Sequence, residues 1–158
     1  MPSLANLRET LSLRAFALWK IPMIAWVRPT VIHLDDARCE IRIPLAMRTR
    51  NHLKSMYFGA LCVGADCAGG LLAIRHIRAR KAKVSFVFKD FQADFVKRPD
   101  GDVHFQCDDG LALRDLVDKA LTTGQRVELP MHLTATVPSR GPEPVARFVL
   151  TLSIKRSK

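Results

Sequence analysis

The segment Tyr57–Ile74 constrains the fold of this chain more than any other. Its 18 residues are apolar or small except for one carboxylate, Asp66, and they include four of the chain's eight glycines. A run of this length is at the lower limit of a membrane span, but an Asp at the centre of a span would cost about 2.5–3.5 kcal/mol. The segment therefore favours a helix in the core of a soluble domain, and we expect no membrane span.

The rest of the chain shows two helical patterns and six strand patterns. Leu4–Trp19 has apolar residues near helical spacing, and Leu111–Leu121 is an amphipathic helix closed by Gly124. The strand patterns cover residues 31–34, 39–45, 82–96, 103–107, 127–137 and 145–154. Strands do not alternate regularly with helices, so a doubly wound parallel sheet is disfavoured. The order predicts an α+β fold in which an antiparallel sheet is wrapped around the long apolar helix.

Length and charge limit the domain organisation and the partners. The 158 residues predict one domain over 1–158, in which a helical segment at 1–29 covers the core. The net charge of +10 favours anionic partners: nucleic acid, an acidic membrane surface or a phosphate-bearing small molecule. Binding of single-stranded nucleic acid needs aromatic residues among the basic ones, and the phenylalanines instead lie on strands and resemble core residues. We therefore expect no nucleic-acid partner.

Cysteine usage points to a reducing compartment. Cys39, Cys62, Cys67 and Cys107 match no zinc or redox spacing, so we expect buried, reduced thiols, no metal site and a cytoplasmic protein. The N-terminus has no pattern of a signal peptide, because charged residues interrupt its apolar ones.

A spaced triplet carries a resemblance to a known family. In "RNHLKSMYFGALCVGADCAGG", Gly59 follows Asn51 by eight residues and Asp66 follows Gly59 by seven. This spacing and the order of elements resemble the hotdog-fold acyl-CoA thioesterases of the phenylacetate-pathway type, and the run resembles an uncharacterised branch of that superfamily. The family's His-Gly-Gly is Tyr57, Phe58 and Gly59 here.

The resemblance implies a thioesterase site with assigned roles. Asp66 would be the general base or nucleophile, the N–H groups of Gly59 and Phe58 would form the oxyanion hole, and Asn51 would position the reacting group. Tyr57 would contact the substrate, an acyl-CoA or another acyl thioester. Coenzyme A would enter only as part of the substrate, with no other cofactor. The departure at the His-Gly-Gly position leaves an alternative: a non-catalytic hotdog protein that binds acyl-CoA.

The helix geometry around Asp66 is compatible with these roles, but each of the proposed residues also has a structural alternative. On a helix, residues 59, 62, 63, 69, 70 and 73 share a face with Asp66 and are small, which leaves room for a ligand or for close backbone packing. Burial would raise the pKa of Asp66 and make it a better base, but the residue could instead serve a structural hydrogen bond. Gly59 could simply pack against a strand, Asn51 could be a loop residue, and Ser55 could cap the helix.

A basic run follows the apolar helix. Arg75, Arg78, Arg80 and Lys81 suit the phosphates of coenzyme A. The alternative is a solvated helix end whose cations complement the helix dipole.

The strand pattern at 82–96 predicts an oligomer. A long apolar strand left at a sheet edge invites aggregation, and pairing with its twin across a two-fold axis would bury it. The resemblance also implies a homodimer, or two dimers in a tetramer, with Asp66 of one chain beside Asn51 of the other.

Overall fold

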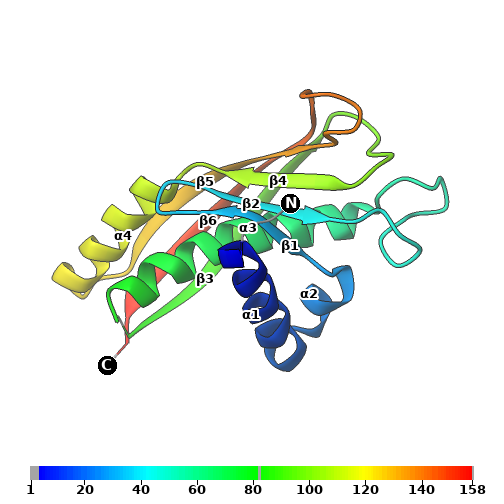
Figure 1. Ribbon diagram of the computed structural model, residues 1–158. Helices are drawn as coiled ribbons and strands as arrows, with labels where there is room; N and C mark the ends of the chain where they lie inside the picture. Colours follow the sequence, from blue (N-terminus) through cyan, green and yellow to red (C-terminus); the bar gives the residue numbers. More distant parts are fainter. Residues whose placement is uncertain (1–3, 82, 158) are drawn as a thin grey trace.

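The computed structural model describes residues 4–81 and 83–157 and shows one long helix held in a curved sheet (Figure 1). The helices are α1 (Leu4–Lys20), α2 (Pro22–Val27), α3 (Phe58–Ala79) and α4 (Gly110–Thr123). The strands are β1 (Thr30–Leu34), β2 (Cys39–Ile43), β3 (Val84–Phe95), β4 (Val103–Cys107), β5 (Val127–Thr136) and β6 (Pro144–Arg156).

The six strands form one antiparallel sheet in the order β1-β2-β4-β5-β6-β3. The sheet packs around α3, which confirms the predicted α+β hotdog arrangement. β3 pairs with β6 along its length and forms one edge of the sheet, with a register shift between Phe88 and Asp90. The predicted edge position of this strand is therefore confirmed for the single chain.

The central helix is buried by close contact with the sheet. Gly64 lies under the fully buried ring of Phe105, and a Cβ added there would be 2.3 Å from two ring carbons. α3 is long and apolar enough to cross a membrane by length and composition alone, but more than half of its most apolar stretch is buried inside the fold. The sheet thus supplies the apolar cover that the sequence required, and α3 is a core helix.

Element boundaries agree with the predictions to within a few residues. The main difference is α3, which continues to Ala79, so Arg75 and Arg78 belong to the helix while Arg80 and Lys81 follow it. The predicted start of the third strand at Ala82 lies outside the described residues. The phenylalanines of β3 are not all core residues: Phe91 and Phe95 are exposed, although their rings contact Phe148. The edge position of β3 is the reason.

The N-terminal helices pack on β1 and α3, below them in the view of Figure 1. Thr10 Oγ1 accepts a hydrogen bond of 2.9 Å from Val31 N, and Arg14 Nε donates one of 2.9 Å to Pro29 O. Leu13 and Ala17 of α1 are buried, as are Ile24 and Val27 of α2. The two helices therefore cover part of the core.

Candidate active site

Asp66 lies on the face of α3 that the sheet leaves open. Gly59, Cys62, Val63 and Gly70 share this face and are half-buried, like Asp66 itself. Gly69 and Ala73 were expected on the same face, but both are buried, so they add no open space beside Asp66. A Cβ at Gly69 would be 3.3 Å from Met131 Cε, so that glycine serves packing against the sheet.

Apolar groups surround the Asp66 carboxyl. It borders a hollow of about 440 Å³ between the N-terminal helices, α3 and β3, and every other residue that lines this hollow is apolar or glycine. Burial raises the pKa of Asp66 above its ordinary value, because the charged form loses hydration. The environment is thus the one expected of a carboxyl that takes up a proton.

The start of α3 presents free donors at its positive end. Tyr57 is the N-cap residue and makes no side-chain capping bond, and Ala60 N already bonds to Tyr57 O at 2.9 Å. The N–H groups of Phe58 and Gly59 precede this first bond, so they lie at the positive end of the helix dipole. These are the two amides that were predicted from the sequence as oxyanion donors, and they lie in the first turn of α3.

Asn51 organises the loop that leads into α3. Its Oδ1 accepts hydrogen bonds from Leu53 N at 2.9 Å, from Ser55 N at 3.2 Å and from Ser55 Oγ at 3.2 Å. Ser55 is therefore committed to Asn51, and the expectation that it caps the helix is wrong. Asn51 therefore holds the loop through its Oδ1. Its Nδ2 takes no part in these bonds and can still donate.

A second hollow, of about 500 Å³, brings part of the site together at the start of α3. Asn51, Tyr57 and Phe58 line it, with residues that include His52, Phe95, Lys97 and Arg98. Lys97 forms an ion pair with Glu143. Lys97 and Arg98 were not among the site residues predicted from the sequence, although they form a basic pair directly after an apolar strand.

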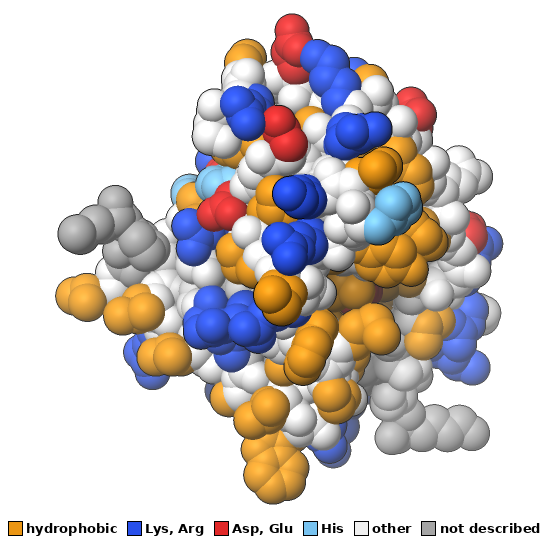
Figure 2. Space-filling view, turned by 90° about the vertical axis from the view of Figure 1, so that its right-hand side faces the viewer, with side chains coloured by type: hydrophobic (Ala, Val, Ile, Leu, Met, Phe, Trp, Pro, Cys, Tyr) orange, Lys and Arg blue, Asp and Glu red, His pale blue; other side chains and the backbone are white. Residues whose placement is uncertain are grey.

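Gly59 lies against the ring of Tyr57. A Cβ at Gly59 would lie 2.4 Å from Tyr57 Cε1, so a side chain there would displace this half-exposed ring from the first turn of α3. The two aromatic rings of Tyr57 and Phe58 are 4.7 Å apart, and Phe58 is 56% exposed. Hydrophobic side chains gather on the face drawn in Figure 2, with Lys and Arg side chains among them. The helix start thus opens onto an apolar surface.

Within one chain, Asp66 and the amide donors do not meet. Seven residues separate Gly59 from Asp66, which is about 10 Å along a helix axis. The two groups border different hollows, Asp66 between α1 and β3 and Phe58 beside the loop. A single carbonyl would need to lie about 3 Å from both kinds of group. One copy of the chain therefore does not bring the predicted base and the predicted oxyanion donors together.

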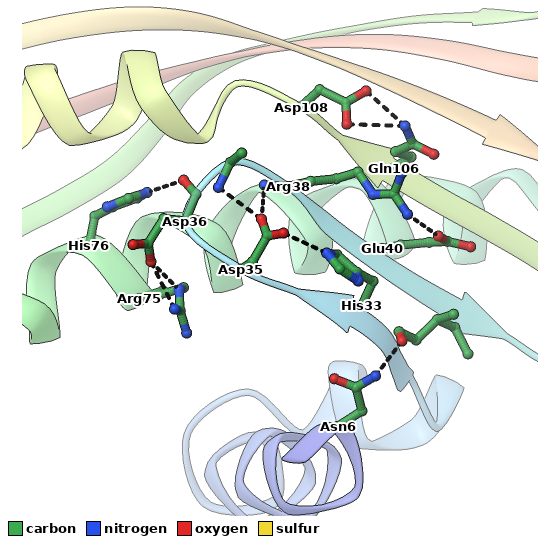
Figure 3. Close-up of polar contacts among 12 residues, drawn as sticks. Asn6, His33, Asp35, Asp36, Arg38, Glu40, Arg75, His76, Gln106 and Asp108 are labelled. Carbon is green, nitrogen blue, oxygen red and sulfur yellow. Dashed lines mark hydrogen bonds and ion pairs between the residues drawn. The ribbon is translucent and has the colours of Figure 1, made fainter. Parts of the chain in front are cut away.

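The basic run lies at the other end of α3. Arg75 and His76 both contact Asp36 of the β1–β2 turn: Arg75 Nε donates to Asp36 Oδ1 at 2.8 Å, and His76 Nε2 lies 2.9 Å from Asp36 O (Figure 3). Arg80 forms an ion pair with Asp118. Arg78 and Lys81 are exposed. Sixteen residues, about 24 Å of helix, separate Gly59 from Arg75, so these cations and the helix start are not brought together.

The cysteines are free thiols, and three of the four are buried as expected. Cys62 is the exception, because it lies half-buried on the face of Asp66. Burial raises the pKa of Cys107 to about 12 and also raises that of Cys67, so these thiols stay protonated. No group of three His, Cys, Asp or Glu side chains able to hold a metal occurs in residues 4–81 and 83–157.

The sequence from residue 10 to residue 152 matches the family described as "Domain of unknown function (DUF4442)". The chain belongs to this family. No curated protein matches the sequence.

Solved structures share the fold over nearly the whole chain. A Pseudomonas aeruginosa protein named "Probable Thioesterase" is 24% identical with a TM-score of 0.78, and the match covers 99% of each chain. A thioesterase from Haemophilus influenzae is 13% identical with a TM-score of 0.66, over 99% of this chain and 92% of that one. A Chlorobaculum tepidum protein of unknown function is 13% identical with a TM-score of 0.82, over 96% and 97%. The resemblance to the hotdog superfamily is thus confirmed at the level of the fold.

Proposed function

We propose that this member of the DUF4442 family is a thioesterase that hydrolyses acyl-CoA or a related acyl thioester. The observation that carries the proposal is the lone Asp66 carboxyl, desolvated beside an apolar hollow on a helix whose first N–H groups are uncapped by a side chain. One protein of similar fold is named a thioesterase and another a probable thioesterase, which supports the same reaction class.

The amides at the start of α3 and the Asp66 carboxylate have different roles in this reaction. The Phe58 and Gly59 N–H groups hold the carbonyl oxygen as it becomes an oxyanion. In one route Asp66 takes a proton from water, whose oxygen attacks the carbonyl carbon; in the other Asp66 attacks directly and water then hydrolyses the mixed anhydride. In both routes the C–S bond breaks, the sulfur leaves as a thiol after it takes up a proton, and the acyl group leaves as a carboxylate.

A second copy of the chain completes the site in this proposal. Asp66 is too far along α3 from Gly59 of the same chain, and β3 is an edge strand with Val87 and Phe91 exposed. Pairing of β3 with its twin would bury that edge and bring Asp66 of one copy toward Asn51 of the other. The active species is then a homodimer, alone or within a tetramer.

Two groups of cations are candidates for the phosphates of coenzyme A. Arg98 lines the hollow at the start of α3, next to the proposed oxyanion hole. Arg75 and Arg80 already neutralise Asp36 and Asp118, which leaves Arg78 and Lys81 as the exposed members of the predicted run. Because of this position, Arg98 is the first candidate for contact with the phosphates of coenzyme A.

The first prediction concerns Asp66→Asn, which keeps the size of the side chain and removes its basicity. Free thiol release from a panel of acyl-CoA esters should fall by at least about a hundredfold, the usual contribution of a general base or more. Asp108→Asn, on the turn after β4, is the matched control and should keep activity. Equal rates for the wild type and Asp66→Asn on every ester would refute the catalytic assignment.

The alternative is a protein that binds acyl-CoA without hydrolysis. One observation favours it: the ring of Tyr57 lies against Gly59 and the exposed Phe58, where the resemblance expects His and Gly. Calorimetric binding of acyl-CoA to the wild type, lost in Phe58→Asp and without any thiol release, would support this alternative.

A further inference from the structure

The hollow beside Asp66 continues past the proposed reacting group along α3. It follows the helix from Asp66 through Gly70 to Ile74, about 12 Å along the axis. Helix α1 contributes Leu13 and Phe16 to the opposite wall. The remaining lining residues come from the α1–α2 corner, α3 and β3: Ile21, Ile24, Cys67, Leu71, Phe86, Val87 and Phe88. Among residues 4–81 and 83–157, Asp66 is the one charged side chain that lines the hollow.

Gly70 keeps this hollow open. Glycine in a helix interior is less favourable than alanine, so its presence needs a reason. Among the described residues a Cβ at Gly70 would meet only Phe88 Cε2, at an ordinary 3.9 Å, whereas a Cβ at Gly69 would meet Met131 Cε at 3.3 Å. Packing explains Gly69 but not Gly70. A side chain at Gly70 would instead occupy the space next to Asp66.

The N-terminal helices form the far wall of this space. Phe16 lines the hollow and is 39% exposed, while its neighbour Trp19 on the same helix is 85% exposed and does not line it. A volume of about 440 Å³ with an almost wholly apolar lining is within the range of small-molecule pockets. Such a surface is complementary to a hydrocarbon chain and offers no polar partner to a hydroxylated or charged one.

We propose that this hollow binds the aliphatic chain of the acyl group, and that Gly70 and Phe16 limit the chain length that the site accepts. The proposal rests on the proposed function, because it places the thioester carbonyl at Asp66 and the chain beyond it. It identifies the substrate class as aliphatic acyl thioesters and assigns the N-terminal helices to substrate selection.

The wild type should show a rising preference along the series acetyl-, butyryl-, octanoyl- and dodecanoyl-CoA. Each methylene that enters an apolar site should raise kcat/KM by about fourfold until the hollow is full. Phenylacetyl-CoA should be a poorer substrate than octanoyl-CoA. A flat series would overturn the proposal while leaving hydrolysis itself intact.

Variants at the two limiting residues should move the preference in opposite directions. Gly70→Leu fills the hollow and should lower kcat/KM for dodecanoyl-CoA by at least about tenfold, with a much smaller change for acetyl-CoA. Ala112→Leu, which adds the same side chain to an exposed site of α4, should change neither. Phe16→Ala should shift the optimum to longer chains, whereas Trp19→Ala on the same helix should not.

Two further measurements test chain binding separately from hydrolysis and from the oligomeric state. If no ester is hydrolysed, calorimetry with a non-hydrolysable dodecanoyl thioether of coenzyme A still tests whether the hollow binds the chain. Loss of binding in Gly70→Leu would support the proposal. Binding that neither Gly70→Leu nor Phe16→Ala changes would overturn it. Light scattering is the second measurement. If Gly70→Leu converts an oligomer to a monomer, Gly70 lies between copies of the chain and the proposal fails.

Discussion

At the scale of the residue, Asp66 is the group on which the account depends. Its carboxyl is half-buried among apolar side chains, and burial is the cause given by the structure for its raised pKa. A folded-state pKa above that of the unfolded chain means that folding is favoured when the group is protonated and disfavoured once it ionises. The same carboxyl that would serve catalysis is therefore a cost to stability at neutral pH.

This cost is testable with Asp66→Asn. The contribution of protonated Asp66 to the free energy of unfolding is fully present below the ordinary Asp pKa of about 3.9. It is lost as the pH rises through the raised pKa of Asp66 in the folded state. Asp66→Asn should therefore be more stable than the wild type at pH 7 in urea unfolding, and the difference should shrink at acidic pH. A variant less stable than the wild type at pH 7 would show that Asp66 makes stabilising bonds and has a structural role.

At the scale of the element, α3 combines two faces with different uses of glycine. Gly64 faces the sheet, where Phe105 leaves no room for a Cβ, and Gly70 faces the hollow, where there is room. The helix is therefore held close to β4 on one side and kept open on the other. The apolar segment Tyr57–Ile74 thus contains one glycine that allows close packing and another that leaves space open.

Alanine substitutions should separate the two glycines. Gly64→Ala should lower the free energy of unfolding by about 1–3 kcal/mol, because the added methyl overpacks a buried ring. Gly70→Ala should raise it by up to about 1 kcal/mol, since the helix gains propensity without a clash. Urea unfolding at one fixed protein concentration measures both. Equal effects at the two positions would mean that α3 is not packed against β4 as described.

The sequence was sufficient for the fold but only for parts of the site. Alternation and helical spacing located every strand and the long helices, because one-sided burial imposes these periods directly. The same patterns could not assign Gly69 to packing or reveal that Ser55 bonds to Asn51, since both depend on contacts with residues of other elements or on loop geometry. Arg75 and Arg80 were predicted to bind phosphate, and their ion pairs with Asp36 and Asp118 depend on folding as well.

At the scale of the whole molecule, the parts of the proposed site lie on one chain but not together. Asn51, Phe58 and Arg98 border one hollow, and Asp66 borders another. β3 is an edge strand of the same molecule, with Val87, Phe91 and Phe95 exposed. A two-fold pairing along this edge would account for both observations, and it makes the dimer a condition of activity.

Mixing two inactive variants tests this central claim most directly. Asp66→Asn removes the base, and Asn51→Asp keeps the Oδ1 that holds the loop while it removes the Nδ2 donor. Each variant alone should release little thiol. In a refolded equimolar mixture half of the dimers carry one intact site, so the account predicts recovery of about a quarter of the wild-type rate. A mixture that stays inactive, although differently tagged chains copurify as dimers, would contradict a site shared between two copies.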